Sequence, residues 1–262
     1  MLIAHPKPLI QATFLARYDR FIARVALQHD EVDAHCVNTG RMEGLIRPGS
    51  KAWVSTVPAD SPRKLRYTLE LLEIDGVLIG VNTLIPNFLA ETIVRARLLK
   101  GMKRYQTLKR EVSYGEGSRI DLLLEGKNSR HWVEVKNCHL VYPDGGAYFP
   151  DSVSERATGH LTELAHKVRA GEKASVLFVV QRKDALFVRP SVLHDPTFAT
   201  AAAEACAAGV RFSAIQFAPG EHGFRYEGTL PVDLKPYNHE QIRGFRDALT
   251  GSSGWKRRGK AG

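Results

Sequence analysis

The sequence has few cysteines and no long apolar run. The first shortage argues against a protein held by disulfides or zinc, and the second against one that crosses a membrane. Cys36, Cys138 and Cys206 are the only cysteines among 262 residues, and no two of them form a C-x-x-C pair. This spacing argues against a disulfide framework or a structural zinc site and suits a reducing cytoplasm. The best apolar stretch, Ala174 to Val180, is far shorter than the roughly 20 residues of a membrane-spanning helix. We therefore expect a cytoplasmic protein without a membrane partner.

Acidic residues are the minority among the charged groups. Lys and Arg number 37 against 28 Asp and Glu, which gives a formal net charge of +9. Clustered cations release counterions from polyphosphate, so this excess favours a nucleic-acid partner without proving one. We expect DNA first, with RNA as an alternative, and nothing in the composition indicates the oligomeric state.

Short strands separated by turn signals fill residues 1–84. The expected strands are Ala12–Leu27, His35–Thr39, Lys51–Thr56, Leu65–Ile74 and Val77–Val81. Asp75-Gly76, between the last two, is a strong hairpin signal. About five such strands predict a small barrel of the oligonucleotide/oligosaccharide-binding (OB) type, although a half-open sandwich would give the same pattern.

The pattern changes after residue 84. A helix is expected over Phe88–Lys100 with Asn87 as its N-cap. The segments after it predict three strands, a helix, a strand, a helix and a final strand, in the ranges 107–113, 119–125, 130–141, 153–170, 174–180, 196–208 and 211–217. This order predicts an α/β domain over 85–250 with a mixed sheet covered by helices. The composition of residues 251–262 predicts a flexible basic tail.

Two neighbouring strands of the second domain carry a set of residues suited to metal-dependent chemistry. Glu134 and Lys136 lie on one face of their strand because strand side chains alternate. Asp121, on the preceding strand, can sit beside Glu134. The two carboxylates and the Val135 carbonyl could then share a hard cation such as Mg2+ or Mn2+. Hydrolysis of a phosphodiester requires such a metal and a nearby cation, which Lys136 would supply.

The acid-x-Lys spacing alone means little, because it also occurs at Glu125-Gly-Lys127 and Asp233-Leu-Lys235. Only Glu134-Val-Lys136 lies inside a β-branched strand with an acid on the strand before it. The plain alternative is a solvent-facing cross-strand pair of Asp121 and Glu134, balanced by Lys136. Glu91 is a candidate third acid for metal or catalysis, although the helix dipole alone favours an acid near a helix start.

Basic and aromatic residues supply the candidates for nucleic-acid binding, since such groups follow a strand by charge and stacking. They are Lys51, Arg63, Lys64, Arg66 and Tyr67 in the first domain, and Arg156 and His160 in the second. For Arg156 and His160, the alternative is that they lie on a solvent-exposed helix face and bind nothing. We interpret the segment Asn38-Thr-Gly-Arg-Met42 either as a simple turn or as a loop that lies at a domain interface or contacts a ligand.

Several segments together resemble the sugar fermentation stimulation protein family of bacteria and archaea. They are Asn38-Thr-Gly-Arg-Met42, Val81-Asn-Thr83 with Pro86-Asn87, Arg119-Ile-Asp121, Val133-Glu-Val-Lys-Asn137, and Phe149-Pro-Asp151 running to Thr162-Glu-Leu164. The resemblance covers nearly the whole chain. It implies an OB-like domain followed by a nuclease-like domain of the PD-(D/E)XK (restriction-endonuclease-like) superfamily, DNA binding without strong sequence preference, and a link to the regulation of sugar utilisation.

Three functions follow from these patterns. The first is a Mg2+- or Mn2+-dependent nuclease in which Asp121, Glu134 and Lys136, with Glu91, form the site. The second is a non-enzymatic, sequence-nonspecific DNA-binding regulator of sugar (maltose-type) metabolism genes, built on the nuclease fold. The third, with little support in the residues, is a barrel that binds a sugar or a small metabolite.

Overall fold

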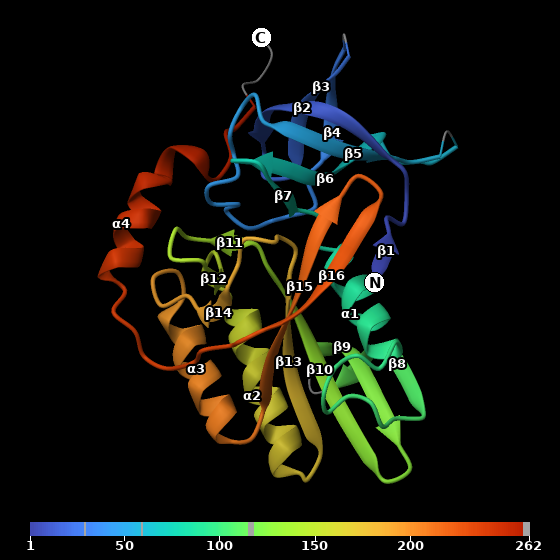
Figure 1. The fold of residues 1–262 in the computed structure, drawn as a ribbon, viewed down its shortest axis with the longest axis vertical. Coiled ribbons are helices and arrows are strands. Elements are labelled where there is room, and N and C mark those ends of the chain that lie inside the picture. The colour runs from blue at the N-terminus through green and yellow to red at the C-terminus, as the bar shows by residue number, and fades with distance from the viewer. Residues whose placement is uncertain (29, 59, 115–117, 259–262) are drawn as a thin grey trace.

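The first part of the molecule is a closed barrel, at the top of Figure 1. The structure, a computed structural model, describes residues 1–28, 30–58, 60–114 and 118–258. The barrel strands are β2 (Leu9–Tyr18), β3 (Ile22–Leu27), β4 (Asp30–His35), β5 (Lys51–Thr56) and β6 (Tyr67–Ile74). They pair in the order β4-β3-β2-β5-β6, and a parallel pairing of β4 with β6 closes the ring. This is the five-stranded OB fold, so the barrel prediction is confirmed.

Turn geometry explains where the barrel strands begin and end. β7 (Val77–Gly80) returns from β6 through Asp75 and Gly76, whose φ angles of 52° and 76° suit a two-residue hairpin turn. Residues 12–27, expected as one strand, form β2 and β3 instead. The break lies at Asp19 and Arg20, which both adopt positive φ and leave a three-residue loop between paired Tyr18 and Ile22.

The second part is built on a seven-stranded sheet. Its strands are β1 (Leu2–Ala4), β8 (Thr107–Tyr114), β9 (Ser118–Gly126), β10 (Ser129–Cys138), β13 (Lys173–Val180), β15 (Arg211–Gly220) and β16 (Gly223–Leu230). The order is β1-β16-β15-β13-β10-β9-β8, with β10, β13 and β15 parallel and the outer pairings antiparallel. The predicted mixed sheet is therefore confirmed.

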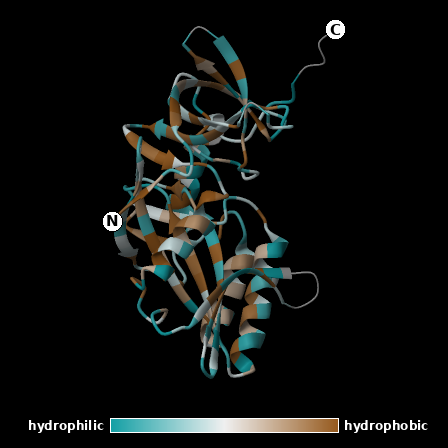
Figure 2. Cartoon of the chain, turned by 90° about the vertical axis from the view of Figure 1, so that its right-hand side faces the viewer, coloured by the Kyte–Doolittle hydropathy of each residue, from teal (hydrophilic) through white to brown (hydrophobic). Residues whose placement is uncertain are grey.

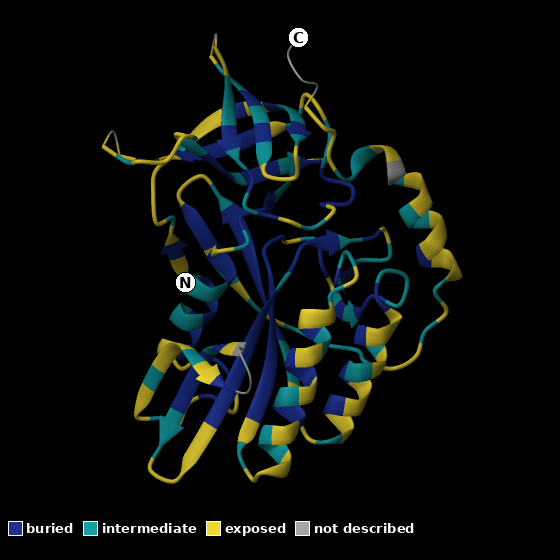
Figure 3. Ribbon diagram, turned by 180° about the vertical axis from the view of Figure 1, so that it is seen from behind, coloured by how far each residue is buried: buried dark blue, intermediate teal, exposed yellow. Residues whose placement is uncertain are grey.

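Helices cover both faces of this sheet. The helix α1 (Ile85–Arg95) packs on one face, whereas α2 (Glu155–Arg169) and α3 (Pro196–Ala207) pack on the other, so that two hydrophobic cores flank the strands. Figure 2 shows hydrophobic strands inside and helices that alternate in hydropathy. Figure 3 shows the central strands buried and the outward sides of the helices exposed. None of the helices in the described part of the chain is long and apolar enough to cross a membrane.

Some elements were not expected from the sequence. A small sheet contains β11 (Leu140–Val141), β12 (Gly146–Phe149) and β14 (Phe187–Pro190), and α4 (Glu240–Ala248) and the 3-10 turn η1 (Thr250–Ser252) follow the main sheet. β1 and β16 were not predicted either. Most of these elements are short, and tertiary contacts rather than a periodic pattern define them. β16 is longer and lies between β1 and β15 in the sheet.

Both ends of the chain pack against the domain that is distant in sequence. β1, from the N-terminus, pairs with β16 at the edge of the second sheet. Residues 252–258, within the segment expected to be a flexible tail, run along the barrel, and their backbone hydrogen-bonds there. The Ser252 carbonyl accepts from Ile46 N at 3.0 Å, and Lys256 N donates to the Arg17 carbonyl at 3.0 Å.

The Asn38–Met42 loop lies at the contact between the two domains. Met42 N donates to Asp151 Oδ2 at 3.1 Å, and a Cβ on Gly40 would lie 2.5 Å from the same oxygen, so only glycine fits. The guanidinium of Arg17, 2% exposed, donates to the carbonyls of Asn38, Gly40 and Gly254 at 2.7, 2.9 and 3.2 Å. One buried cation thus ties the loop to the C-terminal segment.

Candidate active site

The site forms where β9 and β10 separate. Their register ends with Leu122 opposite Val133, so the next residue, Asp121, has no strand partner and turns its carboxylate between the strands. Asp121 Oδ2 accepts from Val135 N at 2.6 Å, and Oδ1 accepts from Asn87 Nδ2 of α1 at 2.7 Å. The carboxylate is therefore fixed from two sides.

Glu134 and Lys136 meet on the face of β10 that α2 covers. Lys136 Nζ donates to Glu134 Oε1 at 2.7 Å, and His160 Nδ1, from α2, donates to the same oxygen. Arg156 Nε lies 3.5 Å from His160 Nε2 and links the group to the exposed end of α2. Glu134 and Lys136 are only 3% and 9% exposed, so the plain alternative, a solvent-facing pair of Asp121 and Glu134 balanced by Lys136, does not hold.

The two carboxylates have opposite pKa shifts because their partners differ. Burial, together with the nearby charge of Glu134, raises the pKa of Asp121 to about 6, and the hydrogen bonds from Val135 and Asn87 only partly oppose this. Burial also acts to raise the pKa of Glu134, but the hydrogen bond from His160 and the charge of Lys136 outweigh it and lower that pKa. Glu134 is thus the more readily ionised of the two.

A divalent cation would fit the polar atoms of this site. Glu134 Oε2 and the Tyr114 hydroxyl are buried without a hydrogen-bond partner, which is costly for a charged oxygen. The described residues contain no group of three or more His, Cys, Asp and Glu that could hold a metal. Two carboxylates are nevertheless sufficient for Mg2+, which keeps several of its waters, and oxygen ligands suit Mn2+ as well.

Glu91 and Asn87 have different places from those expected. Glu91 accepts from Arg95 Nε at 2.8 Å and lies 3.3 Å from Arg110, so its carboxylate is held by two arginines. α1 begins earlier than predicted, with Leu84 at the N-cap position and Asn87 inside the first turn. It is therefore Asn87, and not Glu91, that reaches Asp121, and only the packing of α1 on β9 shows this.

The candidate nucleic-acid residues do not form one surface. Arg63 and Lys64 line a cleft of the barrel, whereas Lys51 pairs with Glu73 at 3.2 Å outside it. Arg66 is exposed, Tyr67 is half-buried and Arg156 is exposed. His160, expected to approach a phosphate backbone, is 4% exposed and supports Glu134 from behind. Its role at the site depends on how α2 packs over β10, which the pattern along the helix does not show.

An OB barrel joined to a restriction-endonuclease-like sheet, with two acids and a lysine on adjacent strands, defines the structural class. Family models agree with this division. One described as "SfsA N-terminal OB domain" matches residues 15–81, and one described as "Sugar fermentation stimulation protein RE domain" matches residues 84–223. The chain belongs to the sugar fermentation stimulation protein family.

Individual relatives are similar over most of the chain. The sugar fermentation stimulation protein homologue of Maricaulis maris is 48% identical and covers 78% of this chain and 88% of its own. That of Thioalkalivibrio sulfidiphilus is 44% identical and covers 86% and 96%. The solved structure of Pyrococcus furiosus SfsA in complex with Ca2+ has a TM-score of 0.81 at 29% identity, covering 88% of this chain and 98% of that one.

Proposed function

We propose that this protein binds nucleic acid, DNA in the first place, and hydrolyses its phosphodiester bonds with the help of Mg2+ or Mn2+. The observation that carries the proposal is the meeting of Asp121, Glu134 and Lys136 where β9 and β10 separate. The net charge of +9 supports a polyanionic substrate. The Ca2+ bound by the Pyrococcus furiosus relative supports a divalent ion in this chain.

Each residue of the site has a separate task in this function. Asp121 and Glu134 would hold the ion, which polarises the phosphoryl oxygen and acidifies a water when bound. Val135 N and Asn87 keep the Asp121 carboxylate in place. His160 occupies Glu134 Oε1 and leaves Oε2 for the ion. Lys136 provides the positive charge that stabilises the phosphoryl group as negative charge develops on it.

The test is cleavage of end-labelled single- and double-stranded DNA and RNA with Mg2+, Mn2+ or EDTA. Glu134→Ala and Lys136→Ala are each expected to reduce metal-dependent cleavage by ~100-fold or more. Glu125→Ala and Lys127→Ala are matched controls, because they change an acid near the end of β9 and a lysine in the turn before β10 at the same spacing. If the Glu134→Ala protein is folded and its cleavage is unchanged, this site does not catalyse the cleavage.

A second function, DNA binding without cleavage, is favoured by one observation. Among the described residues the site offers two carboxylates, and Glu91, the expected third acid, is held by Arg95 and Arg110. A regulator that uses the nuclease fold as a scaffold would bind DNA with an affinity that falls steeply with salt. It would show no cleavage with either metal, and its affinity would not depend on Asp121.

A further inference from the structure

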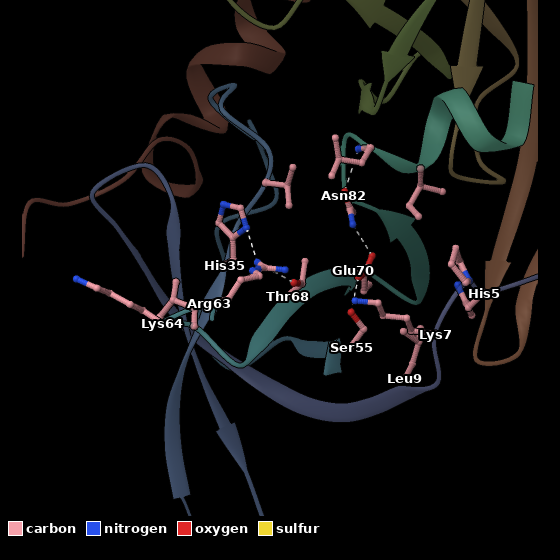
Figure 4. Close-up of a pocket in the computed structure, with 15 residues that line it drawn as sticks. His5, Lys7, Leu9, His35, Ser55, Arg63, Lys64, Thr68, Glu70 and Asn82 are labelled. Carbon is pink, nitrogen blue, oxygen red and sulfur yellow. Dashed lines mark hydrogen bonds between the residues drawn. The ribbon is translucent and has the colours of Figure 1, made fainter. Parts of the chain in front are cut away.

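The barrel has a cleft of about 620 Å3 beside the start of α1, shown in Figure 4. Its volume lies within the roughly 300–1,000 Å3 of pockets that bury small organic ligands. The lining comes from β4, β5 and β6, from the β5–β6 loop, and from the segment between β1 and β2. The figure places Glu70 between Ser55 and Asn82, with His5, Lys7 and Leu9 on one side and His35, Arg63 and Lys64 on the other.

The cleft holds a hydrogen-bond acceptor, the Glu70 carboxylate, and has positively charged side chains at its rim. The Glu70 carboxylate is fixed in the cleft, since Oε1 accepts from Ser55 Oγ at 2.6 Å and Oε2 from Asn82 Nδ2 at 2.8 Å. Ser55 and Asn82 are buried, whereas Lys7 and Arg63 are exposed. A carboxylate at depth repels a phosphate, so a bare phosphate or a phosphate-first ligand does not match this order of charges.

A nucleotide matches this order of charges when its base enters the cleft first. The apolar side chains Leu9, Leu65 and Ile85 line the cleft and suit the faces of a base. Each carboxylate oxygen of Glu70 has a second lone pair, which can accept from an exocyclic amino group, as carboxylates do from cytosine N4. The phosphates would then remain at the rim beside Lys7 and Arg63.

The start of α1 contributes residues to both the cleft and the candidate active site. Leu84 and Ile85 line the cleft, and Asn87 holds Asp121. Asn87 is three positions after Leu84, which corresponds to about 4.5 Å of helix rise. A strand whose nucleotide occupies the cleft therefore has its neighbouring phosphates on the side of the molecule where Asp121 lies.

We propose that this cleft binds one unpaired nucleotide of the nucleic-acid strand, base inward, so that the protein selects single-stranded or frayed segments over continuous duplex. A base paired and stacked in a duplex cannot enter a pocket without first leaving the stack. The proposal rests on the proposed function, because it names the form of nucleic acid that reaches the site.

The test measures the binding of a labelled single-stranded 12-mer and of its duplex in EDTA, so that no cleavage occurs. Lys7→Ala/Arg63→Ala is compared with Arg24→Ala/Arg47→Ala, which removes the same charge from the same barrel outside the cleft, where the two residues pair with Asp33 and Asp75. We expect the cleft variant to lose at least tenfold in affinity for the single strand, and the control less than threefold. Equal losses would overturn the proposal.

A second variant places an acid at the rim without disturbing the core. Leu84 is 69% exposed, and an acid at a helix start is favoured by the dipole, so Leu84→Glu should fold normally. It is expected to weaken single-strand binding about tenfold, whereas Leu186→Glu, at a residue 65% exposed elsewhere, should not. The mononucleotide dCMP should compete with the strand weakly, and inorganic phosphate at equal ionic strength should not compete.

The outcomes separate this proposal from the proposed function. Nucleic-acid binding that is equal in the cleft variants and controls, or tighter for duplex than for single strand, overturns the cleft and leaves the nuclease intact. Affinity for dCMP equal to that for the 12-mer assigns the cleft to free nucleotides and overturns the strand proposal. Absence of any nucleic-acid binding by the wild type removes the proposed function and the cleft together.

Discussion

We expect the stability of Asp121→Asn relative to wild type to be greater at neutral pH than at acid pH when no metal is present. The quantity compared is the difference in free energy of unfolding between the two proteins. The pKa of Asp121 is raised from 3.8 to about 6 in the folded protein by burial and by the charge of Glu134. Below about pH 4 the carboxyl is protonated in both the folded and unfolded states, and its ionisation costs nothing. As the pH rises to about 6, the unfolded state ionises first, so the wild type loses stability through this window.

The magnitude follows from the size of the shift. About two pKa units at ~1.4 kcal/mol each correspond to roughly 3 kcal/mol of stability lost by the wild type between pH 4 and pH 7. Asparagine does not ionise and avoids this loss. It does sacrifice one acceptor for the Asn87 or Val135 donor, at about 1 kcal/mol and at every pH. The difference between variant and wild type should therefore rise with pH by about 3 kcal/mol.

Urea unfolding in EDTA at half-unit steps from pH 4 to pH 7.5 measures this difference. Asp247→Asn is the control, because it makes the same chemical change at a side chain that is 63% exposed on α4, away from the site. Adding Mg2+ or Mn2+ at pH 7.5 should stabilise the wild type and leave Asp121→Asn unchanged. A difference that is constant or falls as the pH rises would refute the reasoning about Asp121.

Three further substitutions test contacts around the site and between the domains. Gly40→Ala should destabilise the protein by about 2–4 kcal/mol in urea unfolding, because the added Cβ would collide with the Asp151 carboxylate. Its control is Gly159→Ala in α2, which has open space around it and should stabilise the protein by up to about 1 kcal/mol. Arg17→Met should cost about 3 kcal/mol in the same assay, because it removes the donor for several backbone carbonyls, among them those of Asn38, Gly40 and Gly254. Asn87→Ala should reduce metal-dependent cleavage by about tenfold, and Glu91→Ala by less than threefold; the reverse order would return Glu91 to the site.

Local patterns in the sequence predict the strands of the site but not its surroundings. The alternation along β10 places Glu134 and Lys136 on one face, and the strand before it supplies Asp121 at the same level. The contact of Asn87 with Asp121 depends on how a helix crosses the sheet. The position of His160 depends on how α2 packs over β10. Such packing angles have no signature in a short stretch of sequence.

The same limit explains the elements that the sequence did not predict. β1 has three residues and gains its structure only by pairing with β16, far along the chain. The segment from Ser252 to Lys256 has the composition of a disordered tail, yet it is ordered by hydrogen bonds to the barrel. Strands defined by distant partners cannot be recognised from propensity alone.

The crossing of the two chain ends determines how this protein can be divided. A fragment that stops at residue 84 would carry β1 with nothing to pair with, and it would lack the segment whose carbonyls accept from Ile46 and Arg17. A fragment that starts at residue 85 would expose the outer edge of β16, which can pair with another copy. Domain boundaries drawn along the sequence are therefore not the boundaries at which it should be cut. A permuted chain that keeps residues 2–4 with the sheet and 252–256 with the barrel offers the better route to separate domains.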